Sequence, residues 1–268
     1  MPEATVPVVS AVSVAPVVPV VITRPLQQAQ LFAQRLRAAG REAVVFPLLD
    51  IHPLDDDAAL KTVLADLERY ALVAFVSPNA IDAALRVRPH WPRGLTIGVV
   101  GEGSRRALAA HGIDHHHATV ISPKNPDRTD SETLLEQLDL AALRGRRALI
   151  IRGESGREFL ADALRHAGVE VEQVAAYRRT APVMDAVRAN ELSRLIDSDV
   201  IWLVTSSEAL RNLLAMVGQL PRADGLARLL QCRLLVPHVR IEEVGRELGF
   251  LHIERSGSGD EQMLAKLQ

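Results

Sequence analysis

The chain has 268 residues, of which 48% are hydrophobic, and its 31 Lys and Arg against 33 Asp and Glu give a formal net charge of −2. This composition is typical of a globular protein and excludes a disordered chain or a fibre. The near-neutral charge and an aromatic content of only 3% argue against a nucleic-acid partner. The single cysteine, Cys232, cannot form an intrachain disulfide, which favours a reducing, cytoplasmic location.

The first 18 residues are interpreted as a flexible tail rich in Pro, Val and Ala. The interval 4–23 carries no charge and has about the length of a membrane span. Pro7, Pro16 and Pro19 interrupt it, however, and it lacks the Lys- or Arg-rich start of a secretory signal. We therefore expect no membrane partner, and an ordered domain that begins near Pro19.

Short apolar segments then alternate with helical segments along the chain. Unbroken runs of Val, Ile and Leu are typical of strands that are covered on both faces, as in parallel sheets. The expected strands are Val20–Thr23, Glu42–Pro47, Leu72–Ser77, Thr96–Val100, Ala148–Arg152, Val169–Ala176, Val200–Thr205 and Arg233–Val236. The expected helices are Leu26–Ala39, Pro78–Leu85, Ser104–His111, Arg157–His166, Ser207–Met216 and Ile241–Leu248. This alternation predicts an α/β fold with open, doubly wound parallel sheets.

The sequence also contains an internal repeat. Three pairs of segments recur in the same order: Val21–Arg24 with Leu149–Arg152, Ala74–Ser77 with Leu203–Ser206, and Val99–Gly101 with Leu235–Pro237. The first two pairs are offset by 128 and 129 residues, respectively. Such order at a nearly constant offset predicts two related α/β halves, each of ordinary domain size.

Small and polar residues follow the expected strands, at the edge where open parallel sheets bind ligands. These candidate binding residues are Arg24, Ser77, Asn79, Gly101, Ser104, Arg152, Gly153, Thr205, Ser206, Ser207 and His238. Exposed amide groups and helix N-termini at this edge favour anions, so we expect a polyanionic, carboxylated ligand in a cleft between the halves. For the serines alone, simple helix capping is an equally good interpretation.

Standard catalytic and cofactor signatures are missing from the sequence. No P-loop or nucleophile elbow occurs, and Gly101–Gly103 lacks the third glycine of a dinucleotide fingerprint. His115–His117 is interpreted as a solvated loop, and Cys232 as an inert small residue. We therefore expect neither a metal nor another cofactor, and a substrate that is reactive by itself.

Tyr177 is the candidate catalytic residue. It lies in the segment Val169–Arg179, at the expected junction of the halves, and is one of only two tyrosines. A phenol is a neutral donor at pH 7 and can protonate or hydrogen-bond a leaving hydroxyl. The alternative is a ring that anchors the sheet beside two solvated arginines, Arg178 and Arg179. The other tyrosine, Tyr70, is expected to serve packing.

These segments together resemble the uroporphyrinogen-III synthase family. The matching stretches are V-V-I-T-R-P at 20–25, F-P-L-L-D-I-H-P at 46–53, F-V-S-P-N-A at 75–80, L-I-I-R-G-E-S-G-R at 149–157, A-A-Y-R-R at 175–179 and V-T-S-S at 204–207. The resemblance implies two flavodoxin-like domains joined by a two-stranded linker. One domain would combine residues 19–43 and 180–268, the other would span 52–170, and the linker would comprise 44–51 and 171–179.

The resemblance also implies a reaction. Linear hydroxymethylbilane would lose its terminal hydroxyl as water and close to uroporphyrinogen III with inversion of the last pyrrole, without metal or organic cofactor, in a monomer. Tyr177 matches the tyrosine that the family uses to assist departure of the hydroxide. Ser77, Ser104 and Ser206 match hydroxyl positions in the family's loops, and Arg24 and Arg152 match the arginines that end the paired strands.

The chain departs from the family pattern in two places. The second G-x-x-T loop is here Pro237-His238-Val239-Arg240, so either His238 or Arg240 is the candidate to take over the carboxylate contact of the missing threonine. Ala71 stands where an aspartate is usual, and we interpret this as loss of a strand-edge cap. Two other classes of function stay open: a non-catalytic two-lobed module that binds a small polycarboxylate, and a scaffold without a ligand.

Overall fold

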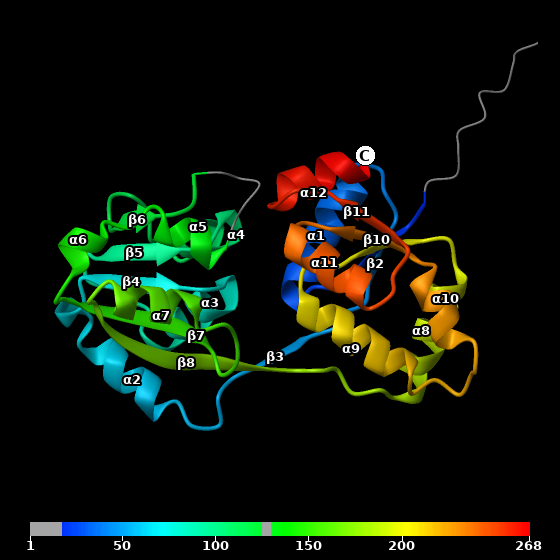
Figure 1. Cartoon of the computed structure of the whole chain (residues 1–268), viewed down its shortest axis with the longest axis horizontal. Coiled ribbons are helices and arrows are strands. Elements are labelled where there is room, and N and C mark those ends of the chain that lie inside the picture. Colours follow the sequence, from blue (N-terminus) through cyan, green and yellow to red (C-terminus); the bar gives the residue numbers. More distant parts are fainter. Residues whose placement is uncertain (1–17, 125–129) are drawn as a thin grey trace, which may run out of the picture.

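Two separate β-sheets, each covered by helices on both faces, make up the computed structural model (Figure 1). The structure describes residues 18–124 and 130–268, so the expected tail lies outside the described residues except for Val18. We call each sheet with its helices a lobe. Within the described residues, no helix combines the length and the apolarity needed to cross a bilayer.

The first lobe is built on five parallel strands. Their order is β2 (Ala43–Val45), β1 (Val20–Ile22), β9 (Ile201–Leu203), β10 (Arg233–Val236) and β11 (His252–Arg255). One face is covered by α1 (Leu26–Ala38) and α12 (Asp260–Leu267), the other by α8 (Ala186–Asp197), α9 (Ser207–Val217), α10 (Gly225–Leu230) and α11 (Val239–Glu247). Residues 20–22 are fully buried, as expected of a central strand covered on both sides.

The second lobe has five parallel strands and one antiparallel edge strand. The parallel strands are β8 (Glu170–Thr180), β7 (Arg147–Gly153), β4 (Leu72–Phe75), β5 (Thr96–Val99) and β6 (Thr119–Ile121). One face carries α2 (Ala58–Ala65), the 3₁₀ turn η1 (Leu67–Arg69), α3 (Pro78–Val87) and α4 (Glu102–Ala110), and the other α5 (Ser131–Leu135), α6 (Leu140–Leu143) and α7 (Phe159–His166). The antiparallel edge strand is β3 (Asp50–His52).

The sheet order confirms the internal repeat. The repeated segments β1 and β7, β9 and β4, and β10 and β5 hold equivalent positions in the orders β2-β1-β9-β10-β11 and β8-β7-β4-β5-β6. In chain order, the first sheet has the 2-1-3-4-5 arrangement of flavodoxin-like folds. The second has the order 5-4-1-2-3, because the chain enters it at the equivalent of β9. The lobes are therefore circular permutations of one α/β unit.

A short antiparallel ladder joins the lobes. Residues 50–52 of β3 pair with residues 178–180 at the end of β8, and the ring of His52 contacts the Thr180 hydroxyl at 3.0 Å. The expected linker segments also contain sheet residues, since 44–45 belong to β2 and most of 171–179 pairs with β7. The domain limits 19–43 plus 180–268 and 52–170 stay a prediction.

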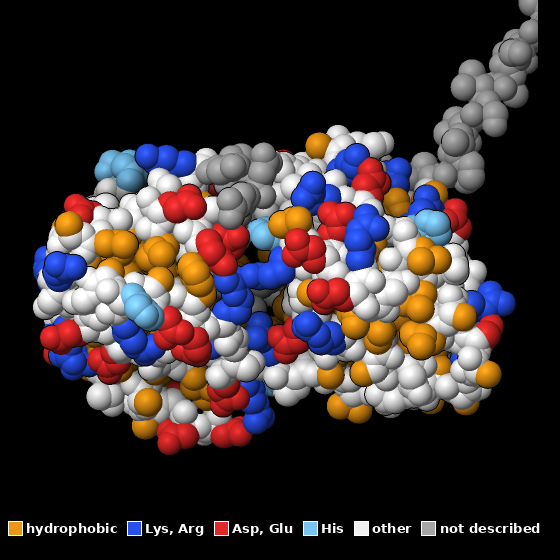
Figure 2. Space-filling model, viewed as in Figure 1, with side chains coloured by type: hydrophobic (Ala, Val, Ile, Leu, Met, Phe, Trp, Pro, Cys, Tyr) orange, Lys and Arg blue, Asp and Glu red, His pale blue; other side chains and the backbone are white. Residues whose placement is uncertain are grey.

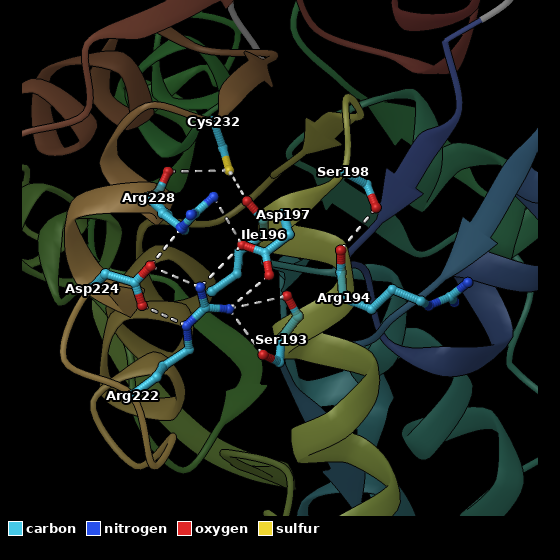
Figure 3. Close-up of polar contacts among 9 residues, drawn as sticks. All are labelled: Ser193, Arg194, Ile196, Asp197, Ser198, Arg222, Asp224, Arg228 and Cys232. Carbon is cyan, nitrogen blue, oxygen red and sulfur yellow. Dashed lines mark hydrogen bonds and ion pairs between the residues drawn. The ribbon is translucent and has the colours of Figure 1, made fainter.

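An ion-pair network ties α10 to α8 in the first lobe (Figure 3). Arg222 contacts Asp197 at 2.9 Å, Asp224 at 2.8 Å and the Ser193 hydroxyl at 2.9 Å. Hydrogen bonds from Arg222 hold the pKa of both aspartates below their usual range. Nearby, burial raises the pKa of the Cys232 thiol, which is thus kept protonated.

This network predicts a pH-dependent stability. A carboxyl whose pKa is depressed by folding stabilises the native state above its unfolded pKa of about 3.9 and loses that contribution as the pH falls toward its folded pKa. Arg222→Gln should therefore lower the urea midpoint most at pH 7 and progressively less as the pH falls from about 4 to about 2, measured by tryptophan fluorescence. Arg246→Gln, which removes an exposed pair with Glu242, is the control and should change little at either pH.

Candidate active site

Loops from both lobes line one continuous cleft. A pocket of about 280 Å³ is bounded by Arg24, Thr205 and His238 of the first lobe and by Gly103 and Arg106 of the second. Two further pockets continue it. One of about 700 Å³ lies between α1, α3 and β3, and one of about 420 Å³ lies at the start of α4. We call this set of pockets the inter-lobe cleft; Lys and Arg side chains gather in the hollow between the lobes (Figure 2).

Tyr177 borders the largest of these pockets. Its side chain is 4% exposed, and its Oη lies 3.0 Å from Ser77 Oγ. Ser77 also caps α3 by accepting the backbone N–H of Ala80 at 3.2 Å. Either hydroxyl can be the donor in this contact, and when Ser77 donates to Tyr177, the phenol proton is free for a ligand.

A β-bulge gives Tyr177 this position. Along β7 and β8, Arg152 pairs with Ala175 but Gly153 pairs with Tyr177, so Ala176 is an extra residue that re-aims its neighbour. The tyrosine ring then lies directly over Gly153, where an added Cβ would come within 3.1 Å of Cζ. Because Gly153 has no side chain, the Tyr177 ring has room to pack over it.

Four polar contacts connect the two lobes near the cleft. They are Gln28 Nε2 to Asn79 Oδ1 at 2.9 Å, His238 Nε2 to Asp130 Oδ2 at 3.2 Å, Arg106 Nη2 to Asp260 Oδ2 at 3.1 Å, and Arg179 Nη2 to Glu208 Oε2 at 3.0 Å. Each lobe thus carries partners for the other, and the cleft is bridged where a ligand would enter.

His238 is the N-cap of α11. Its Nδ1 accepts the backbone N–H of Arg240 at 3.2 Å, so Nε2 carries the proton that it donates to Asp130. Burial raises the pKa of Asp130, but hydrogen bonds from Thr133 and the facing His238 outweigh it and hold the pKa below its usual value. Arg240 borders the same pocket, but the contact to Asp130 is made by His238.

Arg24 faces an acidic partner from its own lobe. Its Nη1 lies 2.8 Å from Asp260 Oδ1, and its guanidinium stacks 4.9 Å from the centre of the Phe32 ring. Burial by itself would raise the pKa of Asp260. The positive charges of Arg24, Arg106 and Arg35 outweigh this effect and hold the pKa below its usual value, so the carboxylate stays ionised.

The remaining candidates divide between cleft and scaffold. Gly101 and Ser104 border the pocket at α4, Asn79 the pocket of Tyr177, and Thr205 that of Arg24. Ser206 caps α9 through the backbone N–H groups of residues 208 and 209, and Ser207 is the first residue of that helix. Arg152 is 8% exposed and binds Glu158 and Gln173 within the second lobe, so its guanidinium is already engaged.

Sequence reasoning missed Asp130, Asp260, Arg106 and Gln28. For two of these residues, the neighbouring sequence contains a pattern that could have identified them. Asp130 heads the stretch D-S-E-T, in which it caps α5, and Asp260 follows the Gly- and Ser-rich loop at 256–259 after β11. Their partners lie 108 or more residues away, so the pairing itself leaves no local trace.

The fold and the cleft define a class: two-lobed α/β proteins with a cleft between the strand tips that is lined by basic side chains of both lobes. Comparison with known proteins narrows this class. The family model described as uroporphyrinogen-III synthase HemD matches residues 30–256. The chain is 33% identical over 253 residues to uroporphyrinogen-III synthase of Escherichia coli K12, with 92% of this chain and 98% of the relative covered. It is 34% identical over 255 residues to that of Salmonella typhimurium, with 92% and 98% covered.

A solved structure shows the same fold. The uroporphyrinogen-III synthetase of Helicobacter pylori superposes with a TM-score of 0.58 at 13% identity, covering 93% of this chain and 98% of that structure. The chain belongs to the uroporphyrinogen-III synthase family. This membership favours the enzymatic interpretation over a non-catalytic binding module.

The bulge and the open space over Gly153 yield a prediction. Gly153→Ala should push the Tyr177 ring away, lengthen the contact to Ser77 beyond hydrogen-bond reach, and lower the free energy of unfolding by about 1–3 kcal/mol through overpacking. A crystal structure and urea unfolding of the variant check this. Gly98→Ala is the matched control, since its Cβ would meet Leu134 at an ordinary 3.5 Å. An unmoved Tyr177 ring would contradict the argument.

Proposed function

We propose that this protein is a cofactor-independent hydro-lyase that cyclises linear hydroxymethylbilane to uroporphyrinogen III, with loss of water and inversion of the last pyrrole. The observation that carries the proposal is the position of Tyr177, which is buried against Ser77 at the wall of a cleft lined by both lobes of a chain in this family. The proposed location is the cytoplasm, and because both walls of the cleft come from one chain, the proposed reaction requires no more than a monomer.

The main demand of the proposed reaction is conformational. A linear tetrapyrrole closes by itself, but to an isomer in which the last ring is not inverted. The cleft must therefore hold the substrate in the geometry in which the inverting closure is fastest, which is catalysis by positioning. The polycarboxylate substrate offers anions to Arg24, to the amides at Gly101 and to the hydroxyls of Ser104 and Thr205.

Tyr177 assists the departure of the hydroxyl in this proposal. With Ser77 donating to its Oη, the phenol proton points to the pocket and is shared with the leaving oxygen. The bond from the terminal carbon to oxygen breaks as the oxygen takes the phenol proton and leaves as water. The far pyrrole attacks the resulting cation through the carbon that already carries its bridge, which gives a spiro intermediate. The older bridge bond then breaks and re-forms at the free carbon of the same ring, which inverts that ring, and the proton displaced from this carbon restores the phenol of Tyr177. Tyr177 is thus the proposed catalytic residue, while Ser77 positions it.

The direct test supplies the protein with enzymatically generated hydroxymethylbilane and resolves the uroporphyrinogen isomers. We expect isomer III as the main product, whereas the control without protein gives isomer I. If the protein also gives isomer I alone, the proposed function is wrong.

A second prediction tests the role of Tyr177. General acid–base catalysis typically contributes about 10²–10⁴-fold, but the hydroxyl of this substrate is a labile leaving group, so Tyr177→Phe should slow formation of isomer III by roughly tenfold. Tyr70→Phe is the matched control, because Tyr70 is equally buried but bonds to Glu172 on the far side of the lobe's core. If Tyr177→Phe unfolds at the same temperature as the parent protein and forms isomer III at the same rate, Tyr177 has no role in the mechanism.

A further inference from the structure

Three arginines from three elements converge on one carboxylate in the cleft. Arg24 precedes α1 and reaches Asp260 Oδ1 at 2.8 Å, whereas Arg106 of α4 reaches Oδ2 at 3.1 Å. Arg35 of α1 completes the set at 3.3 Å from Oδ2. The side chains of Arg24 and Asp260 are only 12% and 21% exposed, so the ion pair is partly shielded from water. Such a carboxylate is held far more firmly than one in an exposed pair.

This cluster lies within the inter-lobe cleft. Arg24, Arg106 and Asp260 border the same pocket as His238 and Arg240. The basic groups of this pocket therefore already bind an anion, and that anion belongs to the protein. Arg24 and Arg106 come from opposite lobes and use the two different oxygens of Asp260, which is the way a bridging substrate carboxylate would be held.

The second contact across the same pocket follows the same logic. His238 of the first lobe donates to Asp130 of the second, so an acidic side chain again pairs with a basic group that faces the cleft. Arg24 and His238 were both expected from the sequence to contact an anionic ligand. In the structure each of them faces an aspartate of the chain itself, Asp260 and Asp130 respectively.

We propose that Arg24 and Arg106 form a receptor for one carboxylate of the linear substrate, and that Asp260 occupies this receptor in the empty cleft and gives way when substrate binds. This inference rests on the proposed function and adds Arg106 to its binding residues. Exchange of one carboxylate for another never leaves Arg24, whose side chain is only 12% exposed, without an anionic partner, and such a loss would be destabilising.

The exchange also selects for the class of ligand. A carboxylate tethered to the same chain competes at a high effective concentration, so a ligand with a single carboxylate displaces it poorly. A polycarboxylate that is anchored elsewhere in the cleft presents its next carboxylate at a comparable effective concentration and can compete. Asp260 thereby favours ligands with several carboxylates over small acids.

The test measures binding of uroporphyrin III, a stable polycarboxylate, by fluorescence titration of the whole protein. Asp260→Asn removes the competing charge and keeps the side-chain shape, so its Kd should fall roughly threefold to tenfold relative to the parent protein. Glu261→Gln is the matched control, because Glu261 is the next residue of α12 and pairs with Arg35 at 2.6 Å rather than with Arg24 or Arg106 among the described residues. Its Kd should be unchanged.

A second variant keeps the test decisive. Arg106→Gln should raise the Kd severalfold, and in the double variant the gain from Asp260→Asn should largely disappear because the two residues act on the same carboxylate. An unchanged or higher Kd for a folded Asp260→Asn overturns the proposal. If that variant does not fold, an unchanged Kd for Arg106→Gln overturns it. These titrations do not depend on turnover, so a failure of the isomer assay is distinguishable from a failure here.

Discussion

The arrangement of the cleft depends on the course of strand β8. Over its first residues β8 completes the second sheet beside β7, at the bulge it turns Tyr177 over Gly153, and its last three residues pair with β3 on the way to the first lobe. One strand therefore packs a lobe, aims the candidate catalytic side chain and joins the lobes. A change in its register would alter all three at once, because a slip by one residue moves every side chain to the other face of the sheet.

Opposite charges on the two lobes explain how such a cleft can stay charged without a ligand. Arg106 forms an ion pair with Asp260, and His238 forms a hydrogen bond with Asp130, so the groups suited to bind anions already have acidic partners within the chain. Arg24, which is only 12% exposed, would be destabilising without such a partner. The two aspartates therefore contribute contacts between the lobes as well as partners for the basic groups of the cleft.

Much of the fold could be predicted from the sequence, because central strands are continuous apolar runs and the repeat is ordered. The edge strands β6 and β11 were missed, since an edge strand such as H-I-E-R is half polar and exposed. The sequence predicted which residues follow the strands, but it did not predict which residues their side chains contact. Arg152 was expected in the cleft, yet it binds Glu158 in its own lobe, because a position in a strand does not fix what the side chain reaches.

The circular permutation of the lobes has a consequence for how the chain assembles during synthesis. The second lobe is contiguous in sequence, so it can collapse as soon as β8 has left the ribosome. The opening β1–α1–β2 unit finds its sheet partner only in β9; the Thr23 hydroxyl donates to the carbonyl of Leu203, 180 residues later. Until then its buried valines have no sheet to join. The N-terminal unit therefore waits for about 180 further residues before β9 can join it, and its apolar side chains are prone to aggregation during that time.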